Sequence, residues 1–205
     1  MSFMPLIENT WMVLLLWAVL GYLIGSVPFG VIVAKAMGLG NLRDIGSGNI
    51  GATNVLRTGS KPAAAATLLR DGAKGALALL LARSLSGEDA AQVAALAAMI
   101  GHCYPVWLKF QGGKGVATFL GILLAIAWPV GLAVCAAWLI GAALTRMSSM
   151  GGLVAAAASS ILVIVMGYGG AYLLCLALTL IVFWRHRANI SRIRAGTEPK
   201  IGQKT

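Results

Sequence analysis

Long apolar stretches, separated by short segments rich in glycine and charge, occupy most of the 205-residue chain. Because a helix needs about 20 apolar residues to cross a bilayer, with a range of roughly 17–25, each stretch is a candidate transmembrane helix. The pattern predicts seven of them, some short, at residues 11–36, 62–85, 90–108, 116–127, 129–144, 151–166 and 171–184. No internal repeat and no long linker interrupts this order, so we expect residues 1–205 to form a single all-α membrane domain, a polytopic bundle of seven transmembrane helices.

The apolar run over residues 116–144 decides the number of helices. It is long for one helix and has Trp128 and Pro129 near its middle, so it can be one long tilted helix or two short helices that turn there. With two helices and the N-terminus outside, only Arg83 falls on the outer side, and the inner side holds Lys35, Arg43, Arg57, Lys61, Lys109, Lys114, Arg146, Arg185, Arg187, Arg192, Arg194, Lys200 and Lys204. Cytoplasmic segments of membrane proteins collect Lys and Arg, whereas a single long helix would leave the basic C-terminal tail outside. We therefore predict two helices here, an N-terminus outside and a cytoplasmic C-terminus.

The composition agrees with a membrane protein. Hydrophobic residues make up 59% of the chain and charged residues only 11%, which excludes a typical soluble domain as well as a disordered chain. Sixteen Lys and Arg against six Asp and Glu give a net charge of +10, which could serve nucleic acid, anionic lipid, small anionic substrates or membrane topology alone. The three cysteines have unrelated spacings and predict neither disulfides nor a metal site.

The first unusual polar segment covers residues 38–61. Its glycines allow unusual backbone conformations, and successive N–H groups in such a loop can form an anion nest. Short polar side chains and an arginine, whose forked cation suits phosphate, add further donors. More such residues are present than a plain turn requires, so we expect this segment to bind substrate through Gly46, Ser47, Gly48, Asn49, Thr53, Asn54 and Arg57.

The second segment, residues 109–115, is a glycine-rich turn that opens the predicted helix from residue 116. A helix N-terminus with a lysine beside it favours an anion, which makes Gly112, Gly113, Lys114 and Gly115 candidate binding residues. An interfacial turn whose lysines face lipid is the plainer alternative. A nucleotide-binding P-loop is not supported, because it would need glycine in place of Leu108 and Ser or Thr in place of Gly115.

The third segment is the basic tail over residues 185–202. If the segment is helical, His186 and Asn189 share one face with Arg192 nearby, which favours a site. For Arg187, Arg194, Lys200 and Lys204 we prefer binding to the anionic head groups of membrane lipid.

Charged and polar residues also occur inside or at the ends of the predicted helices. Asp71 and Lys74, three residues apart in an apolar helix, can pair on one face, and we expect them to support the structure. His102 fits either a supporting role or a ligand contact, and Ser149, beside Ser148, can offer a hydroxyl to the site.

All three segments fall on the predicted cytoplasmic side and combine cations, hydroxyls and amides. Acidic residues are scarce there, so no carboxylate pair is available to hold Mg²⁺. We expect a site without metal or cofactor that binds one or two phosphorylated anions and uses an already activated substrate. Nucleic acid is not an expected partner.

These residues resemble the motifs of the bacterial acyl-phosphate:glycerol-3-phosphate acyltransferase family, the PlsY type. The resemblance covers nearly the whole chain and is carried by GSGNIGATNVLR at residues 46–57, GH at 101–102 with KFQGGKGVAT at 109–118, and RHRANISR at 185–192 with GTE at 196–198. Arg70 departs from the family, which more often has an apolar residue there.

The resemblance implies transfer of a fatty acyl group from acyl phosphate to the 1-hydroxyl of sn-glycerol 3-phosphate, in the inner membrane of a bacterium with the active site facing the cytoplasm. A soluble enzyme would supply the acyl phosphate. On this basis we expect Ser47, Lys114, His186 and Asn189 to be catalytic, and Ser149 and Arg192 to bind substrate together with the loop residues. We expect a structural, supporting role for Glu198, Asp71, Lys74 and His102. The hydroxyl would attack the acyl phosphate directly, with the phosphate group or His186 accepting its proton; a transient acyl-Ser47 enzyme is the variant.

Other classes fit less well. An acyltransferase with aspartate five residues after a catalytic histidine is excluded, because Trp107 and Ser191 stand at those positions. A membrane transporter or flippase for an organic phosphate is the main alternative, although the predicted outer side lacks polar motifs. A lipid-binding scaffold would not need the glycine-rich segments.

Overall fold

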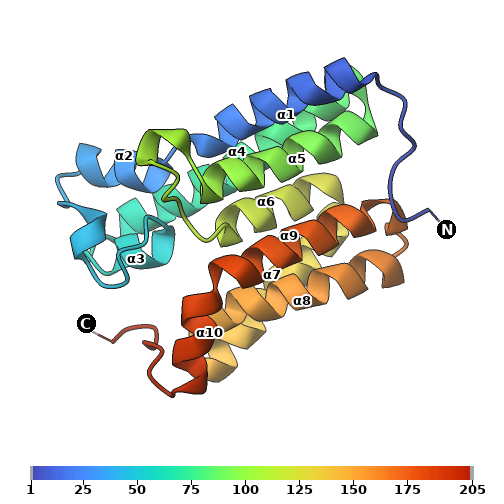
Figure 1. The fold of residues 1–205 in the computed structure, drawn as a ribbon. Coiled ribbons are helices and arrows are strands. Elements are labelled where there is room, and N and C mark those ends of the chain that lie inside the picture. The colour runs from blue at the N-terminus through green and yellow to red at the C-terminus, as the bar shows by residue number, and fades with distance from the viewer. Residues whose placement is uncertain (1, 204–205) are drawn as a thin grey trace. The chain divides into compact units, whose positions relative to one another are not determined.

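We analysed a computed structural model, which describes residues 2–203. These residues form helices and no strand. The order is α1 Trp11–Ser26, α2 Phe29–Ala36, the 3-10 helix η1 Leu42–Asp44, α3 Ala52–Leu56, α4 Lys61–Ser86, α5 Glu88–Cys103, η2 Val106–Leu108, α6 Val116–Ile126, α7 Trp128–Thr145, α8 Ser148–Val165, η3 Gly169–Ala171, α9 Tyr172–Arg185 and α10 Arg187–Arg194 (Figure 1). They divide into an N-terminal unit, Glu8–Ile122, and a C-terminal unit, residues 2–7 with 123–203.

Prolines explain two interruptions of the apolar runs. The expected turn near Trp128 is confirmed, since α6 ends at Ile126 and α7 begins at Trp128 with Pro129 in its first turn, where the missing N–H has no helical partner to lose. The run over residues 11–36, expected as one helix, is two, because Val27 and Pro28 separate α1 from α2. Proline disfavours the helical conformation of the residue before it, and Val27 has an extended ψ of 117°.

By length and composition, four helical segments can cross a membrane: Trp11–Ala36, Glu88–Leu108, Trp128–Thr145 and Ser148–Val165. The pair Gly169–Arg185 and Arg187–Arg194, bent by 60°, makes five if it counts as one span. Of the other predicted spans, α4 contains five charged residues, and α6 has only 11 residues. The helices therefore follow the predicted ranges. Length and composition identify four or five transmembrane spans, fewer than the seven expected.

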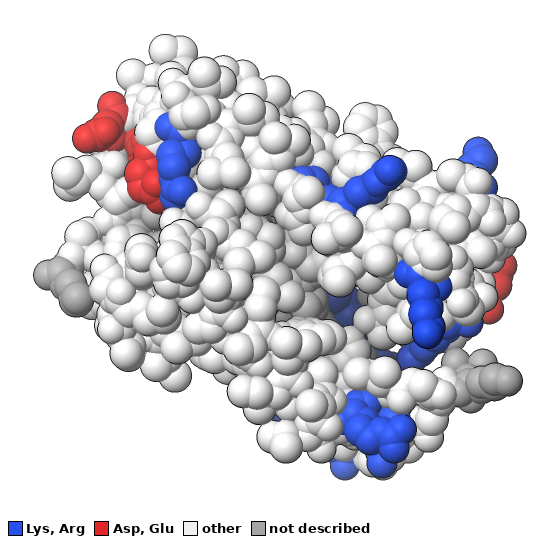
Figure 2. All heavy atoms as spheres, turned by 180° about the vertical axis from the view of Figure 1, so that it is seen from behind, with Lys and Arg blue, Asp and Glu red and all other residues white. Residues whose placement is uncertain are grey.

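The surface agrees with a lipid environment. Large apolar side chains are highly exposed, among them Leu69 at 71%, Leu144 at 82% and Val165 at 75%. On the face shown in Figure 2, most of the surface is neither basic nor acidic. Apolar surface on this scale is unusual for a monomeric soluble protein and is normal for helices that face lipid.

Close helix contacts build the frame of the N-terminal unit. Helices α1 and α5 run side by side (Figure 1), and a Cβ placed on Gly25 would lie only 2.1 Å from the carbonyl oxygen of Ala98. Helices α4 and α6 approach equally closely, because a Cβ on Gly121 would lie 2.1 Å from the carbonyl oxygen of Gly72. Small residues matter here because lipid-exposed helices gain little from hydrophobic association and depend on close packing.

A small apolar cluster attaches the first polar segment to this frame. Leu42, Ile50 and Val55 of the segment are buried against Val33 of α2 and Ala63 of α4. The polar residues between them are therefore held in place by packed apolar neighbours rather than by a free loop.

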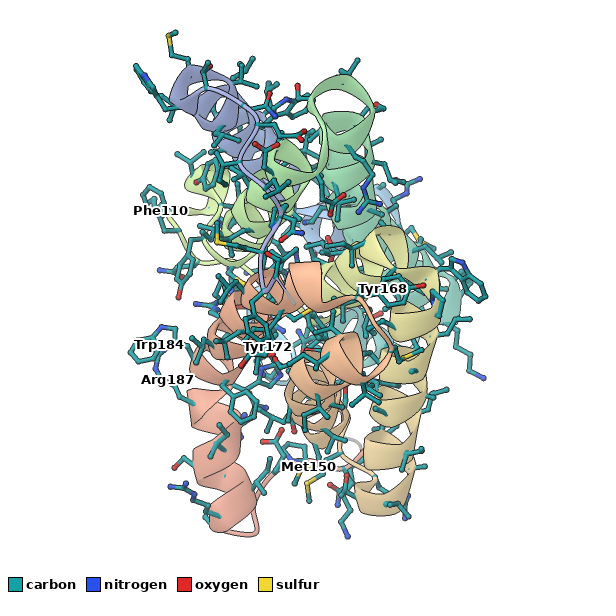
Figure 3. The ribbon with its side chains drawn as sticks, turned by 90° about the vertical axis from the view of Figure 1, so that its right-hand side faces the viewer. Phe110, Met150, Tyr168, Tyr172, Trp184 and Arg187 are labelled. Atoms are coloured by element: carbon teal, nitrogen blue, oxygen red, sulfur yellow. The ribbon has the colours of Figure 1, made fainter. Side chains whose placement is uncertain are left out.

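The C-terminal unit is built on α7, α8 and α9. Thr179 of α9 donates its hydroxyl to the carbonyl of Ala156 in α8 at 2.7 Å. The first residues of the chain join this unit, since Phe3 packs against the ring of Tyr172, labelled in Figure 3, with ring centroids 5.4 Å apart. Helix α9 ends in the sharp bend to α10, which carries the third polar segment.

Candidate functional site

Asn54 holds the first polar segment in shape. Its side-chain oxygen accepts from the backbone N–H of Ser47 at 3.0 Å and from the Ser47 hydroxyl at 3.3 Å, and its amide donates to the carbonyl of Leu42 at 2.9 Å. Asn54 is only 2% exposed. It was expected to contact substrate, but the structure uses it to present Ser47, which is exposed.

Gly46 makes room for the arginine of this segment. It has a φ of +52°, which favours glycine, and a Cβ on it would lie 2.5 Å from Nη1 of Arg57 and 2.6 Å from Cδ. The Arg57 side chain therefore lies directly against the Gly46 backbone. Of the other expected residues, Thr53 is exposed, whereas half-buried Asn49 accepts from the N–H of Ile50 at 3.0 Å.

The glycines of the second segment serve close packing against α5. The N–H of Gly112 donates to the carbonyl of Cys103, and that of Gly113 to the carbonyl of His102, both at 3.1 Å. These two donors, which we expected to face an anion, are already used within the protein. A Cβ on Gly115 would lie 2.2 Å from Cε of Met99, so this glycine is also required by packing. The half-buried Lys114 and the start of α6 remain as candidate anion-binding features of the turn.

Arg43 connects the first two segments. One guanidinium nitrogen donates to the carbonyl of Gly48 at 3.0 Å, and the other donates to the carbonyl of Gln111 in the second segment. The N-terminal unit thus joins the segment with Ser47 and Arg57 to the one with Lys114. Sequence reasoning assigned Arg43 only to membrane topology, because its two partners lie at sites that spacing along the chain does not bring together.

The charged residues inside α4 form a buried cluster with His102. The Nζ of Lys74 lies 2.8 Å from Oδ1 of Asp71, which confirms the expected pair, and both side chains are 3% exposed. The Nδ1 of His102 lies 3.7 Å from the same oxygen. Lys74 also donates to the carbonyl of Val27 at 2.8 Å, next to the interruption between α1 and α2.

His186 and Asn189 are buried at the start of the third segment. His186, 2% exposed, lies at the junction of α9 and α10, and Asn189, 4% exposed, follows within α10. The Nδ1 of His186 lies 2.8 Å from the carbonyl oxygen of Val182. Since a carbonyl only accepts, Nδ1 carries a proton and donates this hydrogen bond.

Glu198 organises the residues of the C-terminal unit. Its Oε1 accepts from the Ser149 hydroxyl at 2.6 Å and from the Asn189 amide at 2.5 Å, while its Oε2 accepts from Nε of Arg192 at 2.8 Å. Burial raises the pKa of Glu198, but these hydrogen bonds and the Arg192 charge outweigh it, so the pKa lies below its usual value. Ser149 and Arg192, expected to contact substrate, are therefore first of all partners of Glu198.

The tail has features of a membrane interface. The guanidinium of Arg187 lies 4.8 Å from the centre of the Trp184 ring, and Figure 3 shows both side chains on one side of the helix. Exposed aromatic and basic residues at a helix end are typical of lipid head-group contact, as expected for Arg187. Lys200 is exposed, and Lys204 lies outside the described residues.

The structure divides the expected residues between the units. The N-terminal unit holds the first two segments and the cluster of Asp71, Lys74 and His102; the C-terminal unit holds Ser149, His186, Asn189, Arg192 and Glu198. Within residues 2–203, no group of three or more His, Cys, Asp or Glu is arranged to hold a metal ion.

Comparisons with known proteins agree with this chemistry. The profile of a family described as glycerol-3-phosphate acyltransferase matches residues 15–196. A glycerol-3-phosphate acyltransferase of Ruegeria pomeroyi is 66% identical over 202 residues, covering 98% of this chain and 100% of the relative. One from Cereibacter sphaeroides is 59% identical, covering 98% and 96% of the two chains.

Solved structures give the same result. The glycerol 3-phosphate form of PlsY (YgiH), described as an integral membrane glycerol 3-phosphate acyltransferase, matches with a TM-score of 0.87 and 35% identity, over 92% of this chain and 96% of that one. The lysophosphatidic acid form matches with a TM-score of 0.84 and 33% identity, over 92% and 95%. These names agree with acyl transfer and not with transport of an organic phosphate.

Proposed function

The chain belongs to the glycerol-3-phosphate acyltransferase family, and from this premise we propose its acyl donor, the roles of its residues and its orientation in the membrane. The donor is acyl phosphate. A fatty acyl group passes to the 1-hydroxyl of sn-glycerol 3-phosphate and gives 1-acyl-glycerol 3-phosphate, known as lysophosphatidic acid, and inorganic phosphate. This reaction begins bacterial phospholipid synthesis.

The reaction exchanges one acyl–oxygen bond for another and transfers one proton. The hydroxyl oxygen bonds to the acyl carbonyl carbon, the bond from that carbon to the phosphate oxygen breaks, and the proton passes to the phosphate group or to His186. Phosphate is a good leaving group, so the enzyme mainly needs to position two anions and offset their repulsion. Cations and hydrogen-bond donors suffice for this work, without a metal ion.

One observation carries the proposal: Arg43 bonds both the first and the second segment, each of which contains a cation. Arg57 and Lys114 bind the phosphate of glycerol 3-phosphate from these segments. Ser47, Asn49 and Thr53, with local N–H groups, bind the acyl phosphate.

We assign His186 and Asn189 to glycerol 3-phosphate because both lie in the third segment, which resembles a motif of the family. With Nδ1 donating to the carbonyl of Val182, the neutral form of His186 accepts a proton at Nε2, as a general base requires. Ser47 is less suited to be a nucleophile, because its hydroxyl donates to the Asn54 amide oxygen, which is not a base. We therefore favour direct attack over an acyl-Ser47 enzyme.

The enzyme lies in the bacterial inner membrane with seven spans, its N-terminus outside and its active site facing the cytoplasm. The concentration of Lys and Arg on one predicted side supports this orientation. A soluble enzyme that makes acyl phosphate is the functional partner.

Purified protein in detergent tests the donor. With acyl phosphate, glycerol 3-phosphate and EDTA, we expect stoichiometric release of phosphate and formation of the acylated product; no turnover would overturn the donor assignment. Arg57→Ala should raise the apparent KM for glycerol 3-phosphate roughly ten- to hundredfold, the cost of a lost charged hydrogen bond. Arg83→Ala, which removes a cation paired with Glu88 at 2.8 Å, is the control. A labelled acyl group trapped on Ser47 would exclude direct attack.

A further inference from the structure

Two hydrogen bonds hold the short segment that carries Lys114. On one side of it, the N–H of Gly113 donates to the carbonyl of His102 at 3.1 Å. On the other side, the hydroxyl of Thr118, which is fully buried in α6, donates to the carbonyl of Asp71 at 2.8 Å. Both acceptors belong to residues of the buried charged cluster in α4 and α5.

The cluster is buried and is itself anchored. Lys74 and Asp71 form an ion pair at 2.8 Å, and His102 approaches the same carboxylate at 3.7 Å. Lys74 also bonds the carbonyl of Val27, which ties the cluster to the end of α1. The three charged or polar side chains are only 3% to 4% exposed.

Stability alone does not explain such a cluster. Removing two charges from water costs several kcal/mol per ion. A protein with well-packed apolar residues in place of a buried ion pair is often equally stable. Ionisable residues inside membrane helices are expensive and usually have a function. A buried pair does, however, define one orientation for its neighbours, which an apolar contact does not.

The His102 ring transmits that orientation to the turn. A Cβ on Gly113 would lie 2.2 Å from Nε2 of His102, so the backbone next to Lys114 rests directly on the ring. The ring in turn faces Asp71 with its other nitrogen. A change of the Asp71 side chain therefore reaches Lys114 through the ring. The bond from Thr118 to the backbone carbonyl of Asp71 fixes the other end of the segment to the same helix.

We propose that Asp71, Lys74 and His102 are positioning residues for Lys114. They set the place of its ammonium group and so the affinity for the phosphate of glycerol 3-phosphate. The inference rests on the proposed function of Lys114 in binding that phosphate.

A double-mutant cycle on the full-length protein in detergent tests the coupling. Glycerol 3-phosphate binding is measured by calorimetry, which does not depend on the acyl donor. We expect Asp71→Asn to weaken binding roughly ten- to hundredfold, as for a binding group misplaced by about 1 Å. In the Lys114→Ala background the same change should cost less than about twofold, because coupled residues are not additive. Glu88→Gln, which removes another ion pair of the same unit, should leave the affinity unchanged.

A milder variant covers the case in which Asp71→Asn does not fold. Thr118→Val keeps the shape but removes the hydroxyl, and should weaken binding only when Lys114 is present; Thr118→Ser should restore it. Thr179→Val, which removes an interhelical bond of 2.7 Å elsewhere, is the matched control. Equal losses with and without Lys114 overturn the positioning role. If Lys114→Ala alone leaves the affinity unchanged, the proposed function of Lys114 fails first and the inference falls with it.

Discussion

Replacing Gly46 by alanine tests whether the first segment is shaped around Arg57. The new Cβ would lie 2.5 Å from Nη1 of Arg57 and 2.6 Å from its Cδ. Since non-bonded heavy atoms prefer about 3.5 Å or more, the arginine side chain must move by roughly 1 Å. The φ of +52° adds about 1–2 kcal/mol of backbone strain for any residue with a Cβ.

The two effects have different consequences. Displacing a substrate-binding group by about 1 Å can cost up to roughly a hundredfold in rate, so we expect kcat/KM for glycerol 3-phosphate to fall ten- to hundredfold in Gly46→Ala. Strain alone should lower Tm by only about 2–8 °C for a chain of this size. Phosphate release at varied glycerol 3-phosphate and a thermal unfolding curve measure the two effects separately.

Gly38→Ala is the matched control. Gly38 lies in the same segment with a φ of +65°, but a Cβ there meets nothing within 4 Å. It should show the loss of Tm without the loss of kcat/KM. If both variants lose activity equally, or if Gly46→Ala binds glycerol 3-phosphate as the wild type does, the role given to the Gly46–Arg57 contact is wrong.

Three further outcomes follow. The pKa of Glu198 in the folded protein is below its ordinary value of 4.5, so the stabilising effect of this carboxylate is complete above pH 4.5 and is lost as the pH falls through the lowered pKa. The Tm of Glu198→Gln should therefore vary less with pH in this acid range than the Tm of the wild type, and an equal pH dependence of the two would refute this role of Glu198. Gly25→Ala should destabilise the protein by about 1–3 kcal/mol through overpacking against Ala98, while Gly170→Ala, with open space around it, should not; denaturant unfolding in detergent compares them. EDTA should leave phosphate release unchanged, and loss of activity restored by a divalent cation would contradict a metal-free site.

Features that depend on neighbouring residues were predictable. The all-helical class and the end of α6 before Trp128 follow from apolar runs and from proline, and both are present. The Asp71–Lys74 pair follows from a spacing of three residues on a helix. The break between α1 and α2 had the same kind of signal in Pro28, but the apolar pattern continued across it and concealed it.

Only the tertiary structure determined which residues far apart in the chain form hydrogen bonds with each other. The glycine-rich segments and the face shared by His186 and Asn189 could be recognised from residue types, because these properties are local. The sequence could not show that Ser149 bonds Glu198, which lies 49 positions away, or that Arg43 reaches Gln111, 68 positions away. A polar side chain binds whichever partner the fold brings within about 3 Å, and spacing along the chain does not determine that partner. The sequence alone therefore identified the type of chemistry, while the packing of helices determined which polar groups hold the protein together.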